Sequence, residues 1–384
     1  MKKIFFIAAT AAAVFASCAK TEVVQTNTEE LTPVTFGVYN GKMATKAVSV
    51  TTYGQINTTA LLEGSTYGFG VFGFFSDNSE GTNDFNPSSS NFTPNFMYNQ
   101  QVEHTSGAWD YTPHKYWPNE YSTTTALSDD VDKLTFFAYA PYVATVGDEG
   151  ITAFSANTAT GDPTVSFKVP QASDKQIDLL WSDAATTNLT KQAISGNVLF
   201  TFKHALSNLS IYPVAVVDAS SIPASSGTNL STGTTIFVND ITIEGAFSQT
   251  GTLNLRTGAW SDKGSSTPSV NYHPTTPLEV TDINDKAEAD AGNPCAEFMF
   301  IPTAVEGYTV TIDYDVKYAA AQSGLAADLV VNNVIHKNID LPLDQGKKMK
   351  LYIGLGMTSV TFSAEVADWT DAADQTIWLP VNTD

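Results

Sequence analysis

Short runs in which apolar and polar residues alternate make up most of this chain from residue 34 onward. In the first run, Val34, Phe36 and Val38 occupy every second position. A period of two residues is typical of a strand with one buried face. Similar runs, rich in Val, Ile, Thr, Phe and Tyr, cover residues 67–75, 134–139, 164–169, 198–202, 209–217, 236–243, 251–255, 297–301, 308–316, 329–334, 348–354, 359–366 and 376–381.

The arrangement of these runs predicts an all-β protein. Gly, Pro, Asn, Asp and Ser separate the runs, and no long stretch shows the 3.6-residue period of a helix. Many short strands of this kind favour sandwiches or barrels over alternating strands and helices. The 384 residues suffice for two domains. A polar stretch at 184–192 precedes a fresh set of strands, so we expect domains at 33–195 and 196–384.

The N-terminus has the pattern of a secretory signal. Two lysines precede an apolar run at 4–15, and small residues at 16–17 precede Cys18. A cysteine at the cleavage point is typical of a bacterial lipoprotein. We therefore expect residues 1–17 to be removed, Cys18 to carry a lipid anchor in the outer membrane, and residues 18–32 to form a tether. Two other interpretations are an ordinary signal peptide with an incidental cysteine, and a buried N-terminal helix.

Charge narrows the choice of partners. The chain has 19 basic and 40 acidic residues, a formal net charge of -21 and a pI of about 4.4. Such a surface repels nucleic acid, whose binding depends on Lys and Arg at phosphates. It also repels anionic membrane surfaces, so membrane attachment would have to come from the lipid.

Searches for catalytic and metal-binding motifs find none. The chain has no HExxH, GxSxG or Gly-rich phosphate-binding motif, and its five histidines lack metal-ligand spacing. His204 near Ser207 and the unpaired Cys295 are expected to be structural. The acidic stretch at 282–290 is expected to be a solvated loop rather than a calcium site. We therefore predict a protein that is not an enzyme and needs no metal or cofactor.

Aromatic residues gather in the segment WDYTPHKYWPNEY at 109–121. If these rings were exposed, they could stack on a sugar, which would suit a monomeric surface lipoprotein that binds glycans. If they were buried, they would be core and turn residues. Large aromatic residues are usually well buried, so we favour the second interpretation.

Four segments, taken in order, carry a family resemblance. They are the start at Cys18, WDYTPHKYWP with KLTFFAYAPY (133–142), NVLFTFKHALSNLSI (197–211) with VNDITIEGAFSQTGTLNLRTGAW (238–260), and VTFSAEVADW (360–369). This layout resembles the fimbrillin-type pilins, which are lipoprotein subunits of type V pili in anaerobic Gram-negative bacteria.

The resemblance implies two transthyretin-like antiparallel β-sandwich domains in tandem, without catalysis. It implies a structural fimbrial subunit at the cell surface that supports adhesion. Its partners would be other pilin subunits, in a homo- or heteropolymer, together with a host protein or glycan. It also implies assembly by strand exchange, in which a trypsin-like protease removes the first strand of the precursor and a strand from the next subunit fills the groove.

The leader strand would then contain Val34, Phe36 and Val38. Burying such side chains contributes about 1.5–3 kcal/mol each. Cleavage after Lys46 would make Ala47 the first residue of the mature fold. The family's site usually has arginine, whereas the sole arginine here is Arg256, so the protease would have to be lysine-directed.

The C-terminal segment TIWLPV has the pattern of a donor strand. Ile377, Leu379 and Val381 would share one face of this strand. Pro380 would have to lie where no backbone donor is needed. The alternative is a last strand that pairs within its own domain.

Overall fold

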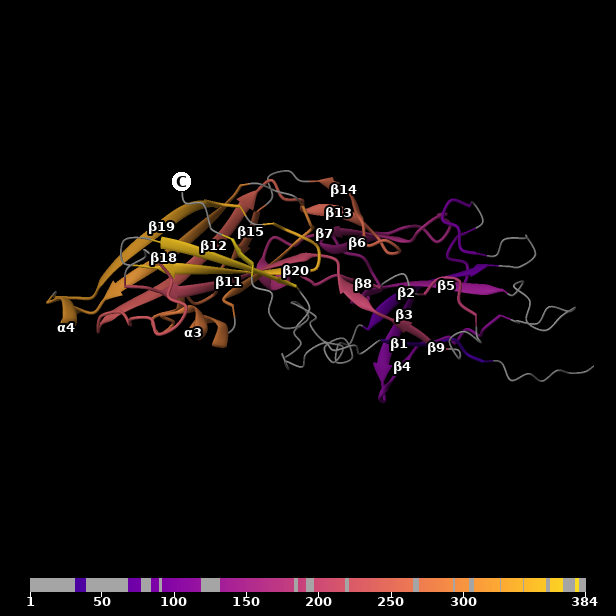
Figure 1. The fold of residues 1–384 in the computed structure, drawn as a ribbon, viewed down its shortest axis with the longest axis horizontal. Coiled ribbons are helices and arrows are strands. Elements are labelled where there is room, and N and C mark those ends of the chain that lie inside the picture. Colours follow the sequence, from indigo (N-terminus) through magenta and orange to yellow (C-terminus); the bar gives the residue numbers. More distant parts are fainter. Residues whose placement is uncertain are drawn as a thin grey trace, which may run out of the picture.

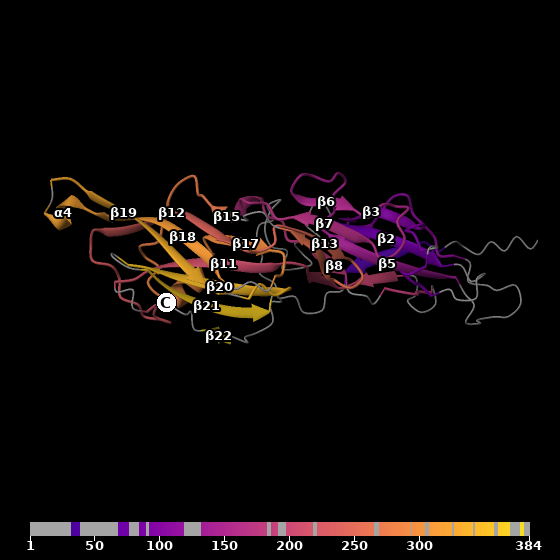
Figure 2. The same cartoon turned by 90° about the horizontal axis from the view of Figure 1, so that it is seen from above.

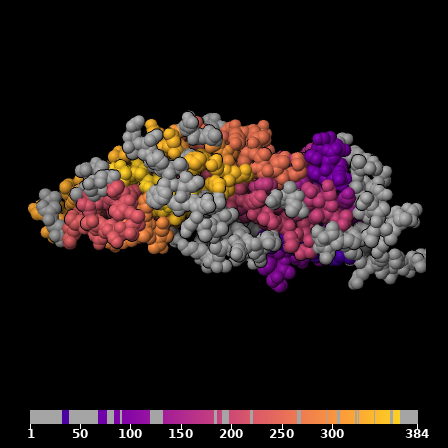
Figure 3. Space-filling model, viewed as in Figure 1, coloured from indigo at the N-terminus to yellow at the C-terminus, as the bar shows by residue number. Residues whose placement is uncertain are grey.

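A computed structural model of the chain describes residues 32–38, 68–76, 84–89, 92–118, 132–182, 186–190, 197–217, 221–264, 269–292, 294–303, 307–324, 326–340, 342–356, 360–368 and 377–379. The molecule is elongated, and the earliest strands lie in one half while the helix α4 (Ala320–Ser323) marks the far end of the other (Figures 1 and 2). The space-filling view has the same outline (Figure 3).

The strands of the first half form three of the sheets. A six-stranded sheet has the order β10 (Phe202–His204), β8 (Leu180–Ser182), β5 (Lys133–Ala140), β2 (Phe69–Ser76), β3 (Met97–Thr105), β4 (Ala108–Asp110). A four-stranded sheet has the order β14 (Trp260–Gly264), β13 (Thr250–Asn254), β7 (Thr164–Lys168), β6 (Gly150–Phe154). A two-stranded ribbon joins β1 (Thr35–Val38) to β9 (Asn197–Phe200).

The second half is a sandwich of two sheets. One has the order β17 (Ala296–Phe300), β11 (Ser207–Ala215), β20 (Lys347–Leu355), β21 (Val360–Asp368), β22 (Ile377–Leu379). The other has the order β15 (Ser269–Tyr272), β12 (Thr234–Gly245), β18 (Tyr308–Tyr318), β19 (Leu329–Ile339), and β16 (Leu278–Glu279) also pairs with β12.

The all-β fold class expected from the sequence is confirmed, with two differences. Most pairs are antiparallel, but β1 pairs with β9, and β11 with β20, in parallel. Several strands were also missed by the sequence patterns, among them β3, β6 and β15. β3, with the sequence MYNQQVEHT, has few apolar residues, and a register shift against β2 interrupts its pattern of buried positions, so its alternation is weak.

The six-stranded sheet is covered on both faces. On one face of β5, Phe137 and Tyr139 belong to the same apolar cluster as Phe167 of β7. On its other face, Phe136 and Ala138 belong to a second cluster, to which β1 and β9 contribute. A strand buried on both faces reads as a continuous apolar run, as β5 does with KLTFFAYA.

The outer face of the second half carries the helix α3 (Lys286–Ala291), where the sequence had suggested a solvated loop. Asp285 caps this helix, because its carboxylate accepts a hydrogen bond from the Glu288 N–H at 2.8 Å. Glu288 in turn accepts one from the Asn284 N–H at 2.6 Å. This arrangement is similar to a capping box, except that Glu288 accepts from the residue before the cap and not from the cap itself. The backbone N–H groups of Glu288 and Gly227 hold the pKa of Asp285 below its usual value.

The sheet pairings cross the expected domain boundary. Residues 191–196 lie outside the described residues, so the division into 33–195 and 196–384 stays a prediction. Three strands from after residue 196, namely β9, β10 and β13, pair with strands from before it, and β14 joins the same sheet as β7 through β13. One apolar cluster also runs from β2 and β7 into both sheets of the second half.

A buried histidine–aspartate pair lies where the two halves meet. The Nδ1 atom of His204, at the end of β10, is 2.9 Å from Oδ2 of Asp178. The side chain of Asp178 is completely buried, and that of His204 is 6% exposed. Removing one partner of such a pair leaves the other buried without its hydrogen bond.

We therefore expect Asp178→Ala to lower the free energy of unfolding by about 3 kcal/mol. Urea unfolding followed by tryptophan fluorescence measures this change. The matched control is Asp174→Ala, which removes a carboxylate that is 74% exposed, and it should change stability by about 0.5 kcal/mol or less. Equal losses in the two variants would contradict the importance of the buried pair.

Candidate strand-exchange groove

The first described segment lies between two parts of the chain that are distant from it in sequence. β1 pairs in parallel with β9, from Thr35 opposite Asn197 to Val38 opposite Phe200. At its start, the Val34 N–H donates to the Lys115 carbonyl at 2.8 Å. The Trp117 N–H donates to the carbonyl of residue 32 at 3.0 Å. Residues 32–38 thus lie in a groove whose walls are β9 and the segment 115–117.

The side chains of this segment alternate as the sequence predicts. Val34 is 1% exposed and Phe36 is 4% exposed. Val38 is half-buried against the apolar cluster that contains Val34 and Phe36. Thr35, which lies between Val34 and Phe36, is exposed. Only one face of this strand is therefore fixed by packing.

Phe36 is the centre of the contacts in the groove. Its ring centroid lies 5.3 Å from those of Tyr111 and Phe136. It stacks on Phe200, with centroids 5.6 Å apart. Aromatic rings at these separations attract one another beyond the effect of burial alone. The floor of the groove is therefore aromatic, and it belongs to β5, β9 and the segment after β4.

Tyr111 links the floor to the backbone of the leader segment. Its hydroxyl group donates a hydrogen bond to the Val34 carbonyl at 2.9 Å. Burial raises the pKa of Tyr111 to about 12, so this hydroxyl stays protonated at neutral pH. The same hydroxyl lies 3.3 Å from the Lys115 carbonyl, so without residues 32–38 it would donate only this longer hydrogen bond.

The proposed donor strand lies in the other half of the molecule. β22 forms the edge of its sheet and pairs with β21, with Leu379 opposite Ala364 and Ile377 opposite Val366 (Figure 2). This is the internal pairing that the sequence left open as an alternative. Val381, like Cys18, Lys46 and Ala47, lies outside the described residues.

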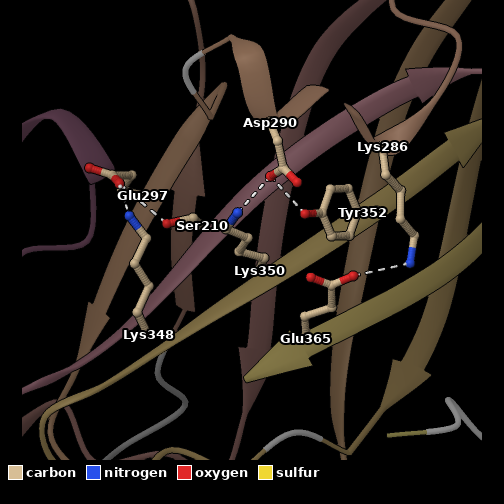
Figure 4. A network of polar contacts seen from close by, with 8 residues as sticks. All are labelled: Ser210, Lys286, Asp290, Glu297, Lys348, Lys350, Tyr352 and Glu365. Carbon is tan, nitrogen blue, oxygen red and sulfur yellow. Dashed lines mark hydrogen bonds and ion pairs between the residues drawn. The ribbon is translucent and has the colours of Figure 1, made fainter. Parts of the chain in front are cut away.

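A polar network holds the strands beside β22 to the helix α3 (Figure 4). Asp290 accepts hydrogen bonds from Lys350 Nζ at 2.6 Å and from the Tyr352 hydroxyl at 2.7 Å. Burial, followed by hydrogen bonding with Asp290, raises the pKa of Tyr352, so its hydroxyl remains a donor. A further bridge on this face joins Ser210, Glu297 and Lys348.

The network also reaches β21 itself. Lys286 Nζ donates to the Ser363 hydroxyl at 2.7 Å and lies 3.4 Å from the carboxylate of Glu365. The same ammonium group lies over the ring of Tyr352, 4.9 Å from its centroid. β21 is thus attached to α3 through side chains as well as to β20 through its backbone, and neither attachment depends on β22.

The aromatic segment at 109–118 is mostly part of the core. Trp117 is 6% exposed and Tyr111 is 5% exposed. Trp109 is half-buried against Phe69, while Tyr116 is 42% exposed. This segment therefore offers a sugar the ring of one exposed tyrosine, Tyr116, and not a set of adjacent exposed rings. Tyr121 lies outside the described residues.

The other candidate residues have structural surroundings. The Ser207 hydroxyl is buried without a hydrogen bond, so it does not pair with His204. Burial raises the pKa of the Cys295 thiol, which keeps it protonated and weakens it as a nucleophile. Within the described part of the chain, no group of three His, Cys, Asp or Glu residues could hold a metal ion. No described helix is long and apolar enough to span a membrane.

Comparison with known proteins identifies the class of protein. The sequence profile of the fimbrillin-like family matches residues 58–369. The fimbrium subunit Fim1C of Phocaeicola vulgatus is 26% identical over 403 aligned residues, which cover 94% of this chain and 95% of that protein.

A solved structure of a fimbrial protein shares the fold. A fimbrial protein from Bacteroides vulgatus ATCC 8482 superposes with a TM-score of 0.59 at 23% identity, covering 88% of this chain and 99% of that one. A putative cell adhesion protein from Bacteroides uniformis ATCC 8492 has a TM-score of 0.45 at 20% identity, covering 79% and 91% of the two chains. The molecule is thus an all-β protein of the architecture seen in fimbrial proteins. The chain belongs to the fimbrillin-like family.

We expect Phe36→Ala to lower the free energy of unfolding by about 3–5 kcal/mol, because it empties the centre of the groove. Chemical denaturation of the uncleaved chain measures this loss. Tyr116→Ala is the matched control, since it truncates an exposed aromatic residue on the groove wall, and it should cost about 0.5 kcal/mol or less. If both variants unfolded alike, the leader segment would contribute little to the fold.

Proposed function

We propose that this chain is a structural subunit of a surface fimbria that polymerises when β1 is exchanged for a strand of the next subunit. The observation that carries the proposal is β1 itself. It is a short strand with Val34 and Phe36 buried in an aromatic groove, and it pairs with β9 instead of with its neighbours in sequence. The relationship to fimbrial subunits supports assembly with other pilin subunits at the cell surface.

Loss of β1 would leave a site that favours an extended segment. Burial of Val34 and Phe36 contributes about 3–6 kcal/mol together, which is a large part of a domain's stability of about 5–15 kcal/mol. The edge of β9 would also lose its backbone partner. An incoming strand would restore both contributions by adding to the sheet edge and filling the pockets for its alternate side chains.

Proteolysis is the proposed trigger. The segment between β1 and β2 contains Lys42 and Lys46 but no arginine. The only arginine of the whole sequence is Arg256. A trypsin-like protease that accepts lysine would cleave after Lys46 and leave Ala47 as the new N-terminus. Before this step, Cys18 would carry the lipid that holds the precursor at the outer membrane.

The proposed donor is the C-terminal strand with Ile377, Leu379 and Val381. In the isolated chain its partner β21 pairs with it over three residue pairs. Release of an edge strand breaks fewer contacts than release of a central one, because only one neighbour is lost. β21 would keep its pairing with β20 and the side-chain bonds from Lys286.

Lysine-specific proteolysis of the full chain should cleave after Lys46, release the leader strand and produce a ladder of stable oligomers on unheated gels. Intact mass identifies the cleavage site. Lys46→Gln should prevent cleavage at this position. Replacing both Lys42 and Lys46 by Gln should prevent release of β1 and oligomer formation, because both lysines lie between β1 and β2, whereas Lys20→Gln, the matched control, should change neither. Cleavage that yields only monomer would contradict strand exchange.

A peptide of residues 372–384 should bind to the cleaved subunit and raise its midpoint of thermal unfolding, because it would refill the groove. The uncleaved chain, whose groove is occupied, should bind the peptide far more weakly. A control peptide with Ile377→Asp and Leu379→Asp should not bind, since charged residues cannot enter an aromatic groove. Equal binding of both peptides, or no binding at all, would contradict the assignment of the donor strand.

A further inference from the structure

Among the strands that the structure describes, β19 is an edge strand with an unusually regular register. Among the described strands it pairs only with β18, and the register runs without a shift from Ile339 opposite Tyr308 to Leu329 opposite Tyr318. Proteins usually protect an exposed edge with proline, a bulge, inward-pointing charges or several lysines. The sequence LVVNNVIHKNI has no proline and no acidic residue, and its single lysine, Lys337, lies near one end.

Apolar side chains are concentrated on this edge. Four of the nine large exposed hydrophobic residues of the described chain lie within six positions of β19. They are Leu329 (45% exposed), Val330 (54%), Val331 (38%) and Val334 (48%). Single exposed apolar residues are ordinary on a protein surface, but a cluster along an unpaired backbone is typical of an interaction site.

The edge is separate from the strand-exchange machinery. The hairpin of β18 and β19 ends at α4, which lies at the far end of the molecule from β1 and β9 (Figures 1 and 2). β22 belongs to the opposite sheet of the sandwich. Exchange of β1 for a donor strand would therefore leave β19 as it is.

We propose that β19 pairs antiparallel with β19 of a second copy of this chain, around a two-fold axis at Asn332. Such a contact is isologous, so one surface serves both subunits and the contact closes on itself. It would supply the missing backbone partner along the strand and join the two sheets into one.

The side chains favour this register. With Asn332 opposite its own equivalent, Val330 lies opposite the partner's Val334, and Leu329 opposite the partner's Ile335. Both are pairs of apolar residues, which stabilise neighbouring strands. Centring the axis one residue earlier or later would place Val330 opposite the partner's Asn332 or the partner's His336 instead.

Charge favours the same strand as the contact between copies. Two chains that each carry a formal charge of -21 repel one another over most of their surfaces. β19 carries no carboxylate. Just before it, Asp328 pairs with Lys317 of its own subunit at 2.9 Å, so its charge is compensated before any contact forms. The Asn332 amide donates to Asp313 at 2.8 Å and to Asp315 at 3.0 Å, which holds these β18 carboxylates within their own subunit.

Cross-linking tests the register in the uncleaved full chain, with Cys18 and Cys295 replaced by serine. Asn332→Cys should give a covalent dimer on mild oxidation or with a short thiol cross-linker, because the two thiols face each other across the axis. Asn338→Cys is the matched control on the same exposed strand. In this register its two thiols lie ~40 Å apart, so it should not cross-link. Equal yields from both variants, or no dimer from Asn332→Cys, would overturn the proposal.

Sedimentation velocity tests the affinity. The unmodified chain should show a concentration-dependent dimer, and Val334→Lys should raise its Kd by about tenfold or more, because it would bury a charge against apolar residues. Val146→Lys adds the same charge at a loop valine that is 41% exposed, and it should leave Kd unchanged. A chain that stays monomeric at all concentrations, or equal effects of the two lysines, would overturn the proposal. Neither result bears on strand exchange, because β1 remains in place.

Discussion

The packing of Phe36 against Phe136 and Phe200 joins the leader segment to the rest of the fold. This packing is needed because β5 has apolar side chains on both of its faces, and both faces must be covered. One face is covered by the sheet of β6, β7, β13 and β14, and the other needs a cover of its own. That cover is made of β1, β9 and the segment after β4. Part of it is a strand of four residues near the start of the chain.

A cover made from a terminal segment differs from an ordinary sandwich layer. Among the described strands, β1 does not pair with the strand that follows it in sequence. Its parallel partner is β9, whose residues are more than 150 positions away. A segment held by backbone bonds to β9 and to residues 115–117, and by two buried side chains, could be replaced by another segment with the same alternation. In the proposed exchange, the groove would therefore select a pattern of side chains, and the identity of the chain that supplies them would matter less.

In the second half of the molecule, α3 is firmly bonded to the central strands of one sheet, while each of the two sheets ends in an edge strand. Side chains of α3 hold the outer face of β20 and β21, so that face does not depend on the strand at the edge. β22 and β19 end their two sheets. The proposed functions use these edges differently: β22 would leave its sheet to enter another subunit, while β19 would stay and pair with its equivalent. Because the surface is strongly acidic, two subunits repel each other least where they meet along strands that are poor in carboxylates.

Local patterning in the sequence was enough to predict most of the strands, because alternation of apolar residues depends only on neighbouring positions. It was enough for the leader strand, where Val34 and Phe36 are buried and Thr35 is not. The helix α3 was missed, although Asp285 and Glu288 have the spacing of a capping box. The tertiary structure alone decided that β1 pairs in parallel with β9 and that β13 returns to pair with β7. Each of these depends on contacts between residues far apart in sequence, and a local pattern contains no information about which distant segment will supply the partner.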